Sequence, residues 1–176
     1  LIITEKVTIS HCVPTILHML VSSPVVKKLD LSRWRVVIGG ARFPKGLAQA
    51  AMDLGIEVMS GFGMSETCPI ISLATLKPGM LDWPKEKQVD VLIKTGMPIP
   101  LVEMKIVDPA GKPLPHDGKT TGELVMRAPW LTAGYFKDPE QSKALGPAGW
   151  LHGGDIANVD PEGYIQITDR LKDVIK

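Results

Sequence analysis

The sequence predicts an α/β fold: a partial parallel-sheet subdomain followed by a small antiparallel β-barrel or sheet subdomain. The apolar run Trp34–Ile38 ends in two glycines, and a helical pattern separates it from a second run, Ile56–Met59, which leads into Gly61–Gly63. Strand, glycine loop, helix, strand and glycine loop in succession are typical of the ligand-binding edge of a parallel sheet. Hairpin signals that recur after Gly96 predict the antiparallel part.

Two amphipathic helices are predicted in the first part. Pro14 stands near the first turn of one helix, where its missing N–H costs little. The apolar face of that helix is expected to carry Val13, Ile16, Leu17, Leu20 and Val21. Pro44 opens the other helix and Gly55 ends it as a C-cap. Residues 77–94 are rich in Lys, Pro, Asp and Glu and predict a surface excursion with one short helix.

Two identical turn signatures organise the second part. Asp108–Gly111 and Asp160–Gly163 each place Asp, Pro and Gly at the first, second and fourth positions, as a type I turn prefers. Strands are expected at 102–107 and 122–127, and on both sides of the second turn. We place the boundary between the two subdomains near Thr95.

Composition excludes several classes of partner. The 176 residues carry a formal net charge of +1, which gives no electrostatic reason to expect nucleic acid or an anionic membrane. No apolar run approaches the roughly 20 residues that a transmembrane helix needs. Cys12 and Cys68 lie far apart without a CxxC spacing, which predicts two reduced cysteines in a cytoplasmic protein and neither a disulfide framework nor a zinc site.

The segment Gly61–Thr67 is the strongest candidate site. Two glycines allow a ligand to approach the backbone, and Phe62 between them offers a flat face for a base. Ser65 offers a hydroxyl to a phosphate oxygen, and Glu66 offers a hard carboxylate oxygen suited to Mg²⁺. A helix starting at Ser65 would add free N–H groups. A plain glycine-rich turn with Ser65 as N-cap is the alternative.

Three further segments carry weaker signals. Gly39–Pro44 is a glycine loop one βαβ step earlier, although it is not a GxGxxG fingerprint. Trp150–Asp155 places an acid after two glycines, where a carboxylate can accept both hydroxyls of a ribose diol. Asp169–Asp173 is a charged run. On local evidence, a plain strand-to-helix turn is the favoured account of Gly39–Pro44 and a solvated surface face that of Asp169–Asp173, whereas a hairpin turn explains Trp150–Asp155 equally well. The four histidines have no nucleophile partner, and His152 alone lies near a proposed site.

Taken together and in order, these segments resemble the core motifs of the adenylate-forming (AMP-binding) superfamily, closest to its medium- and long-chain fatty acyl-CoA ligases. The resemblance covers essentially the whole chain, and five ordered motifs carry it. They are the adenine-bordering loop Gly39–Pro44, the Gly-Tyr-Gly-Met-Thr-Glu-Thr signature at Gly61–Thr67, the Gly-Glu-Leu-x-x-Arg-x-Pro strand at Gly122–Pro129, the Trp-x-x-Thr-Gly-Asp motif at Trp150–Asp155, and the Arg-x-Lys-Asp-x-Ile-Lys segment at Asp169–Lys176.

The resemblance implies an ATP-dependent acid–thiol ligase that uses Mg²⁺, converts a fatty acid to an acyl-adenylate and transfers the acyl group to CoA. It implies that adenine and the α-phosphate are surrounded by Gly40, Ala41, Arg42, Gly61, Phe62, Gly63, Met64 and Ser65. Glu66 would hold Mg²⁺, and Asp155 and Arg170 would reach the ribose. Lys172 would be the hinge to a C-terminal domain. Ser65, Glu66 and Lys172 are thus the expected catalytic residues.

The same resemblance implies domain limits and an incomplete enzyme. Residues 1–95 would be a partial nucleotide-binding subdomain, 96–168 a small β-barrel-like subdomain and 169–176 the hinge. The family's phosphate loop and C-terminal domain are expected outside this chain, so the chain alone is expected to make no acyl-CoA. A homodimer of the parent protein stays open.

Departures from the family pattern keep two alternatives open. Phe62 replaces Tyr, Ser65 replaces Thr, Gly153 replaces Thr, and Arg42 stands where a small residue is usual. A carrier-protein-dependent adenylation domain would share all five motifs. A non-catalytic nucleotide-binding homologue is favoured by Gly153 and Arg42.

Overall fold

The computed structural model describes residues 1–146 and 149–171, and the chain divides into two compact units. The first unit comprises Leu1–Phe62 and Leu73–Gly96, and the second comprises Gly63–Ser72 and Met97–Lys176. The domain boundary that we placed near Thr95 stays a prediction. The division into compact units differs from a single cut at that point, because it assigns Gly63–Ser72 to the second unit. Within the described ranges, no helix has the length and apolar character that crossing a membrane requires.

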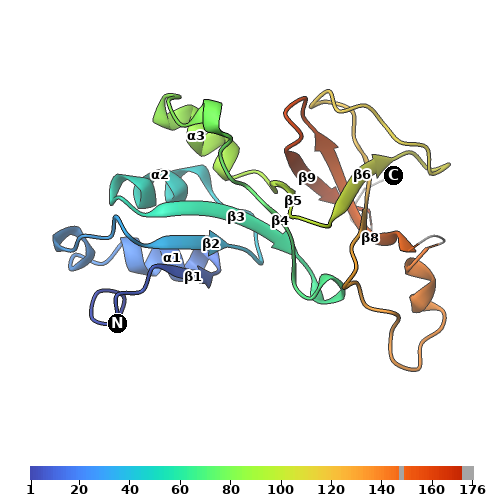
Figure 1. Ribbon diagram of the computed structural model, residues 1–176, viewed down its shortest axis with the longest axis horizontal. Helices are drawn as coiled ribbons and strands as arrows, with labels where there is room; N and C mark the ends of the chain where they lie inside the picture. The colour runs from blue at the N-terminus through green and yellow to red at the C-terminus, as the bar shows by residue number, and fades with distance from the viewer. Residues whose placement is uncertain (147–148, 172–176) are drawn as a thin grey trace. The chain divides into compact units, whose positions relative to one another are not determined.

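The first unit alternates strands and helices, as Figure 1 shows in blue to green. Its elements are β1 (Ile9–Cys12), α1 (Pro14–Val21), η1 (Val26–Lys28), β2 (Arg35–Ile38), α2 (Lys45–Asp53), β3 (Glu57–Gly63), η3 (Pro78–Met80) and α3 (Lys85–Leu92). β1 pairs with β2 and β2 with β3, both in parallel. Together they form a parallel sheet in the order β1-β2-β3. The sequence predicted the β2 and β3 strands of this parallel sheet but not β1.

The core of this unit explains why the short apolar runs become strands. Val36 and Ile38 of β2 are fully buried, and Val58 and Met59, on opposite faces of β3, are also buried. Strands buried on both faces carry continuous apolar runs in place of alternation. Ala48 and Ala51 of α2 complete the core, since their small side chains let the helix approach the sheet closely.

α1 buries a narrower face than predicted. Pro14 is its first residue and Leu17 is fully buried, but Val13 and Ile16 are 40% and 47% exposed. Pro14, Leu17 and Val21 lie three and four residues apart, so they share one side of the helix, and Ile16 falls outside it. The predicted face was therefore too wide by these two residues.

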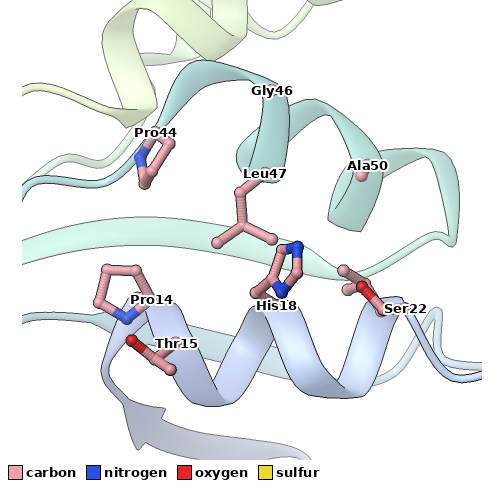
Figure 2. Close-up of a pocket in the computed structure, with 9 residues that line it drawn as sticks. Pro14, Thr15, His18, Ser22, Pro44, Gly46, Leu47 and Ala50 are labelled. Carbon is pink, nitrogen blue, oxygen red and sulfur yellow. The ribbon is translucent and has the colours of Figure 1, made fainter.

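α2 agrees with the sequence prediction. Pro44 precedes it as the N-cap, and Gly55, with φ of +81°, follows its C-cap Leu54. A groove of about 640 Å³ lies between α1 and α2, and Figure 2 shows His18 and Leu47 among the side chains that line it. Its lining includes Pro44 but none of Gly40, Ala41 and Arg42.

The second unit is built on an antiparallel sheet with the order β6-β7-β8-β9. Its elements are η2 (Ser65–Thr67), β4 (Ile70–Leu73), β5 (Met97–Pro98), β6 (Glu103–Val107), β7 (Gly122–Arg127), η4 (Gln141–Ala144), β8 (Leu151–Val159) and β9 (Ile165–Arg170). Buried large side chains form its core: Ile106, Leu124, Met126, Leu151, Tyr164 and Ile165. This is the antiparallel subdomain that the hairpin signals predicted.

Both predicted turns are present. Gly111 N–H donates to Asp108 O at 2.9 Å, and Gly163 N–H donates to Asp160 O at 2.9 Å. Asp138 Oδ1 accepts the N–H of Gln141 at 2.9 Å, so Asp138 caps the turn that leads into η4, which begins at Gln141.

Candidate functional site

In the first unit, the candidate residues lie at the carboxyl ends of the three parallel strands. Gly39 follows β2, and a Cβ built on it would lie 3.1 Å from His11 Nε2 and 3.2 Å from Gly61 O. The structure thus brings the two predicted glycine segments together, as expected for neighbouring parallel strands. It adds His11, which the sequence analysis had left among the scattered histidines. The signal that could have found His11 is its position near the end of β1, where Cys12 pairs with Ile38, the residue before Gly39.

The loop after β2 is open. Gly40, Ala41 and Arg42 are all exposed, and Gly40 adopts φ of +79°, the left-handed region where glycine is at little cost. Phe43 behind them is buried and anchors the loop to the core. Arg42 is therefore a cation on the surface of this unit.

The predicted glycine loop Gly61–Gly63 is instead the end of β3, so that expectation was wrong. A Cβ on Gly63 would lie 1.6 Å from Pro69 O, which excludes any side chain there. The strand continues because its glycines allow this close approach to the returning chain. Phe62, the proposed stacking residue, is half-buried within the strand.

The helix proposed at Ser65 is also absent, since η2 is a single turn of 3₁₀ helix over Ser65–Thr67. Cys68 has φ of +49° and Pro69 follows it, so the chain leaves the helical conformation at once. The expected row of free N–H groups is not formed. Ser65 itself is exposed.

Thr67 holds this loop together, and sequence reasoning had given it no role. It is fully buried, and its Oγ1 accepts the N–H of Met64 at 2.9 Å. The same atom lies 3.0 Å from Met64 O and 2.6 Å from Pro69 O. A hydroxyl has one proton, so the shorter contact to Pro69 O is the donated bond. One side chain thereby closes both ends of the segment that carries Ser65 and Glu66.

Glu66 is half-buried and is bound by a second segment of the same unit. Tyr135 Oη donates to Glu66 Oε1 at 2.6 Å, and Thr132 N–H donates to Glu66 O at 3.0 Å. The bond to the carboxylate raises the pKa of Tyr135, and partial burial and the negative charge of Glu66 add to the effect. Within the described residues, Glu66 Oε2 has no hydrogen-bond partner.

Asp155 is the other carboxylate of the second unit. It lies within β8, not in a turn, and is only 1% exposed. Arg170 Nε pairs with Asp155 Oδ1 at 2.9 Å, and the register of β8 and β9 places the two residues opposite each other. Burial raises the pKa of Asp155, and the charge of Arg170 lowers it in part. Among the residues that the structure describes, Asp155 Oδ2 is buried without a hydrogen-bond partner.

Gly153 of β8 lies against the side chain of Met64. A Cβ on Gly153 would lie 3.0 Å from Met64 Cε and 3.5 Å from its sulfur. Beside it, His152 Nδ1 lies 3.0 Å from Glu123 Oε2 on the neighbouring strand. Met64 therefore lies against β8 at a position two residues from Asp155. Lys172, the expected hinge residue, lies outside the described residues.

The donor and acceptor set fits a nucleotide with a magnesium ion. Asp155 Oδ2 is a buried acceptor that lacks a donor, and a ribose diol supplies donors of this kind. Glu66 offers one free carboxylate oxygen, and the described residues contain no cluster of three or more His, Cys, Asp or Glu side chains able to hold a metal alone. Mg²⁺ commonly binds through one or two carboxylates together with substrate phosphates and water. One carboxylate therefore suits a metal that arrives with its nucleotide.

Comparison with known proteins places the chain in a family. The AMP-binding enzyme family matches residues 1–136. The chain is 41% identical over 143 residues to the long-chain-fatty-acid–CoA ligase of Thermus thermophilus, which covers 81% of this chain and 26% of the ligase. It is 33% identical over 172 residues to the feruloyl-CoA synthase of an Amycolatopsis species, which covers 97% of this chain and 33% of the synthase. The chain thus belongs to the AMP-binding enzyme family and spans only part of the length of these relatives.

Solved structures support the same assignment. The amide bond synthetase McbA from Marinactinospora thermotolerans superposes with a TM-score of 0.85 at 32% identity, over 99% of this chain and 34% of that protein. The N-terminal domain of FACL13 from Mycobacterium tuberculosis superposes with a TM-score of 0.81 at 27% identity, over 96% of this chain and 40% of that domain. The mixed α/β architecture of adenylate-forming enzymes is therefore the fold of this chain.

Proposed function

We propose that this chain is the nucleotide-binding part of an ATP-dependent, AMP-forming acyl-CoA synthetase that takes a fatty acid as substrate. The observation that carries the proposal is Asp155, a buried carboxylate with one unpartnered oxygen, two residues from the Gly153 position that lies against Met64. A buried acceptor without a donor is costly in a folded protein, and a ligand hydroxyl removes that cost.

The proposed reaction has two steps. A carboxylate oxygen of the substrate attacks the α-phosphorus of ATP, and pyrophosphate leaves. The CoA sulfur then attacks the acyl carbon, its proton is released, and AMP leaves. A fatty acid is ionised at pH 7, because ordinary carboxyl pKa values are near 4, so the first step needs no general base.

Because two anions must meet, the protein's task is to position them and to offset their charge. Ser65 would donate its hydroxyl to a phosphate oxygen, and Asp155 would accept the ribose hydroxyls. Glu66 would supply one ligand to Mg²⁺, whose charge lowers the repulsion between the substrate carboxylate and the phosphates. Arg170 would reach the ribose from β9 while it neutralises Asp155.

The fatty-acid substrate is the finer part of the proposal. It is supported by the motif resemblance and by 41% identity to the Thermus ligase. Relatives that are named for ferulate and for 4-hydroxybutyrate match at 33% and 35% identity, so the substrate is assigned to a class and not to a chain length. We further propose that the reaction takes place in the cytoplasm and requires parts of the parent protein outside this chain.

A second candidate is an amide-forming enzyme. The superposition with an amide bond synthetase at a TM-score of 0.85 favours it. That candidate shares the adenylation step and differs in the acceptor, which would be an amine in place of the CoA thiol.

The test is pyrophosphate release by the full-length protein across carboxylates of increasing length, followed by product analysis with CoA or an amine present. Release that peaks with a fatty acid, together with thioester formation, supports the proposal. Amide formation in place of thioester supports the second candidate. Nucleotide binding without pyrophosphate release from any carboxylate, unchanged by Glu66→Gln, would mean a non-catalytic homologue.

A further inference from the structure

Glu66 is fixed from two directions by one distant segment, residues 132–142. Thr132 N–H donates to the main-chain oxygen of Glu66 at 3.0 Å, and Tyr135 Oη donates to its side-chain Oε1 at 2.6 Å. Tyr135 is 69 positions away in sequence, so the contact is a product of the tertiary fold. One bond sets the backbone of Glu66 and the other sets its carboxylate.

The segment that presents Tyr135 is itself ordered by hydrogen bonds. Tyr135 N–H donates to Ser142 Oγ at 2.9 Å, and Ser142 Oγ donates to Asp138 O at 2.6 Å. Thr132 Oγ1 donates to Gly134 O at 3.1 Å. These bonds lie on both sides of Tyr135, so the phenol oxygen has a defined position before any ligand arrives.

We propose that Tyr135 is a positioning residue for metal-bound nucleotide: it holds Glu66 Oε1 and leaves Oε2 as the oxygen that binds Mg²⁺. The inference rests on the proposed function and deepens it by adding a residue that none of the five motifs contains. A free glutamate side chain loses rotamer freedom when it binds a metal, and a glutamate that is already held loses less. Tyr135 therefore favours binding without touching the nucleotide.

The test uses the full-length protein and the variant Tyr135→Phe, which removes one oxygen and keeps the ring. Calorimetry gives the Mg²⁺ concentration that half-saturates binding of a non-hydrolysable ATP analogue, and a separate titration gives the affinity for AMP without metal. We expect Tyr135→Phe to raise the half-saturating Mg²⁺ concentration by about 5- to 20-fold and to leave AMP affinity within about twofold. Phe136→Leu is the matched control, because its ring is 90% exposed on the same segment, and it should change neither value.

A double-mutant cycle with Glu66→Gln separates positioning from a merely structural role. If Tyr135 acts through Glu66, Tyr135→Phe has no further effect on the Mg²⁺ requirement once Glu66 is Gln. An unchanged Mg²⁺ requirement in the single variant overturns the inference. So does an equal loss of Mg²⁺ and AMP binding, or an effect that persists in the Glu66→Gln background. A wild-type protein that binds the ATP analogue without any need for Mg²⁺ overturns the metal role in the proposed function itself.

Discussion

Replacing Asp155 with Asn should weaken nucleotide binding and leave the fold intact. The buried carboxylate would accept two ribose hydroxyls, and the amide retains one acceptor oxygen and loses the charge. Hydrogen bonds to charged groups are stronger than those between neutral groups. The variant should therefore lose about 2–3 kcal/mol of binding free energy, which raises Kd by about 30- to 150-fold. Calorimetry with AMP on the full-length protein measures this directly.

Asp155→Asn should not reduce the stability of the fold, in contrast to its effect on nucleotide binding. Asp155 is 1% exposed whereas the side chain of its partner Arg170 is 58% exposed, so the substitution leaves no buried charge behind. Breaking a buried pair costs several kcal/mol only when an uncompensated charge stays buried. A half-solvated pair contributes about 0–1 kcal/mol, and the Asn side chain avoids the cost of burying a carboxylate. We therefore expect the free energy of unfolding at pH 7 to be unchanged or up to about 1 kcal/mol higher.

The pH dependence follows from the direction of the pKa shift. Burial raises the pKa of Asp155 above its ordinary value of 3.8, so the folded state binds this proton more tightly than the unfolded state. The wild-type protein therefore loses stability as pH rises through the raised pKa. The advantage of Asp155→Asn should be largest at pH 7 and should shrink as pH falls toward the ordinary value. A variant that loses more than about 2 kcal/mol at pH 7 while AMP affinity stays normal would refute this reasoning.

Three further predictions concern the close contacts at Gly63, Thr67 and Gly153. Gly63→Ala should prevent the segment after β3 from forming, because its Cβ would lie 1.6 Å from the main-chain oxygen of Pro69. Gly46→Ala in α2 is the control: its Cβ would meet nothing within 4 Å, so the free energy of unfolding should rise by about 0.5–1 kcal/mol. Thermal denaturation compares the two variants. Thr67→Val should cost about 1–3 kcal/mol by leaving the N–H of Met64 without its acceptor, and Thr67→Ser should restore most of it in urea titrations. Gly153→Thr, which introduces the residue usual in the family motif, should shift unfolding by less than about 1 kcal/mol, because the atom it meets at 3.0 Å is the flexible end of Met64, and pyrophosphate release should not fall.

Local signals were sufficient to predict much of the fold. The turns at Asp108 and Asp160 depend on Asp, Pro and Gly at fixed positions, and the structure has both. The parallel strands β2 and β3 follow from short apolar runs that end in glycine, whereas β1, with the sequence Ile-Ser-His-Cys, carries no such signal. The end of α2 follows from Gly55, whose positive φ few other residues adopt at low cost.

The contacts that build the candidate site depend on the tertiary fold and were not predictable in this way. Glu66 was identified as a hard ligand, but its partner Tyr135 lies in a segment that contains none of the five motifs. Thr67 was visible as the last letter of a motif, yet its role depends on the chain returning at Pro69. Gly61–Gly63 was predicted as a loop because glycine is rare in strands, whereas a returning backbone needed the space.

The pairing of Asp155 with Arg170 could not be predicted by counting residue pairs outward from the turn at Asp160–Gly163. Val159 pairs with Ile165 and Ala157 with Ile167, and an unbroken register continued from these pairs would set Asp155 opposite Asp169. Two carboxylates directly opposite each other would repel. The register shifts between Ile156 and Ala157, which moves Arg170 opposite the buried acid. The register shift therefore determines that Arg170 pairs with Asp155. The turn, which the sequence does predict, does not determine this pairing.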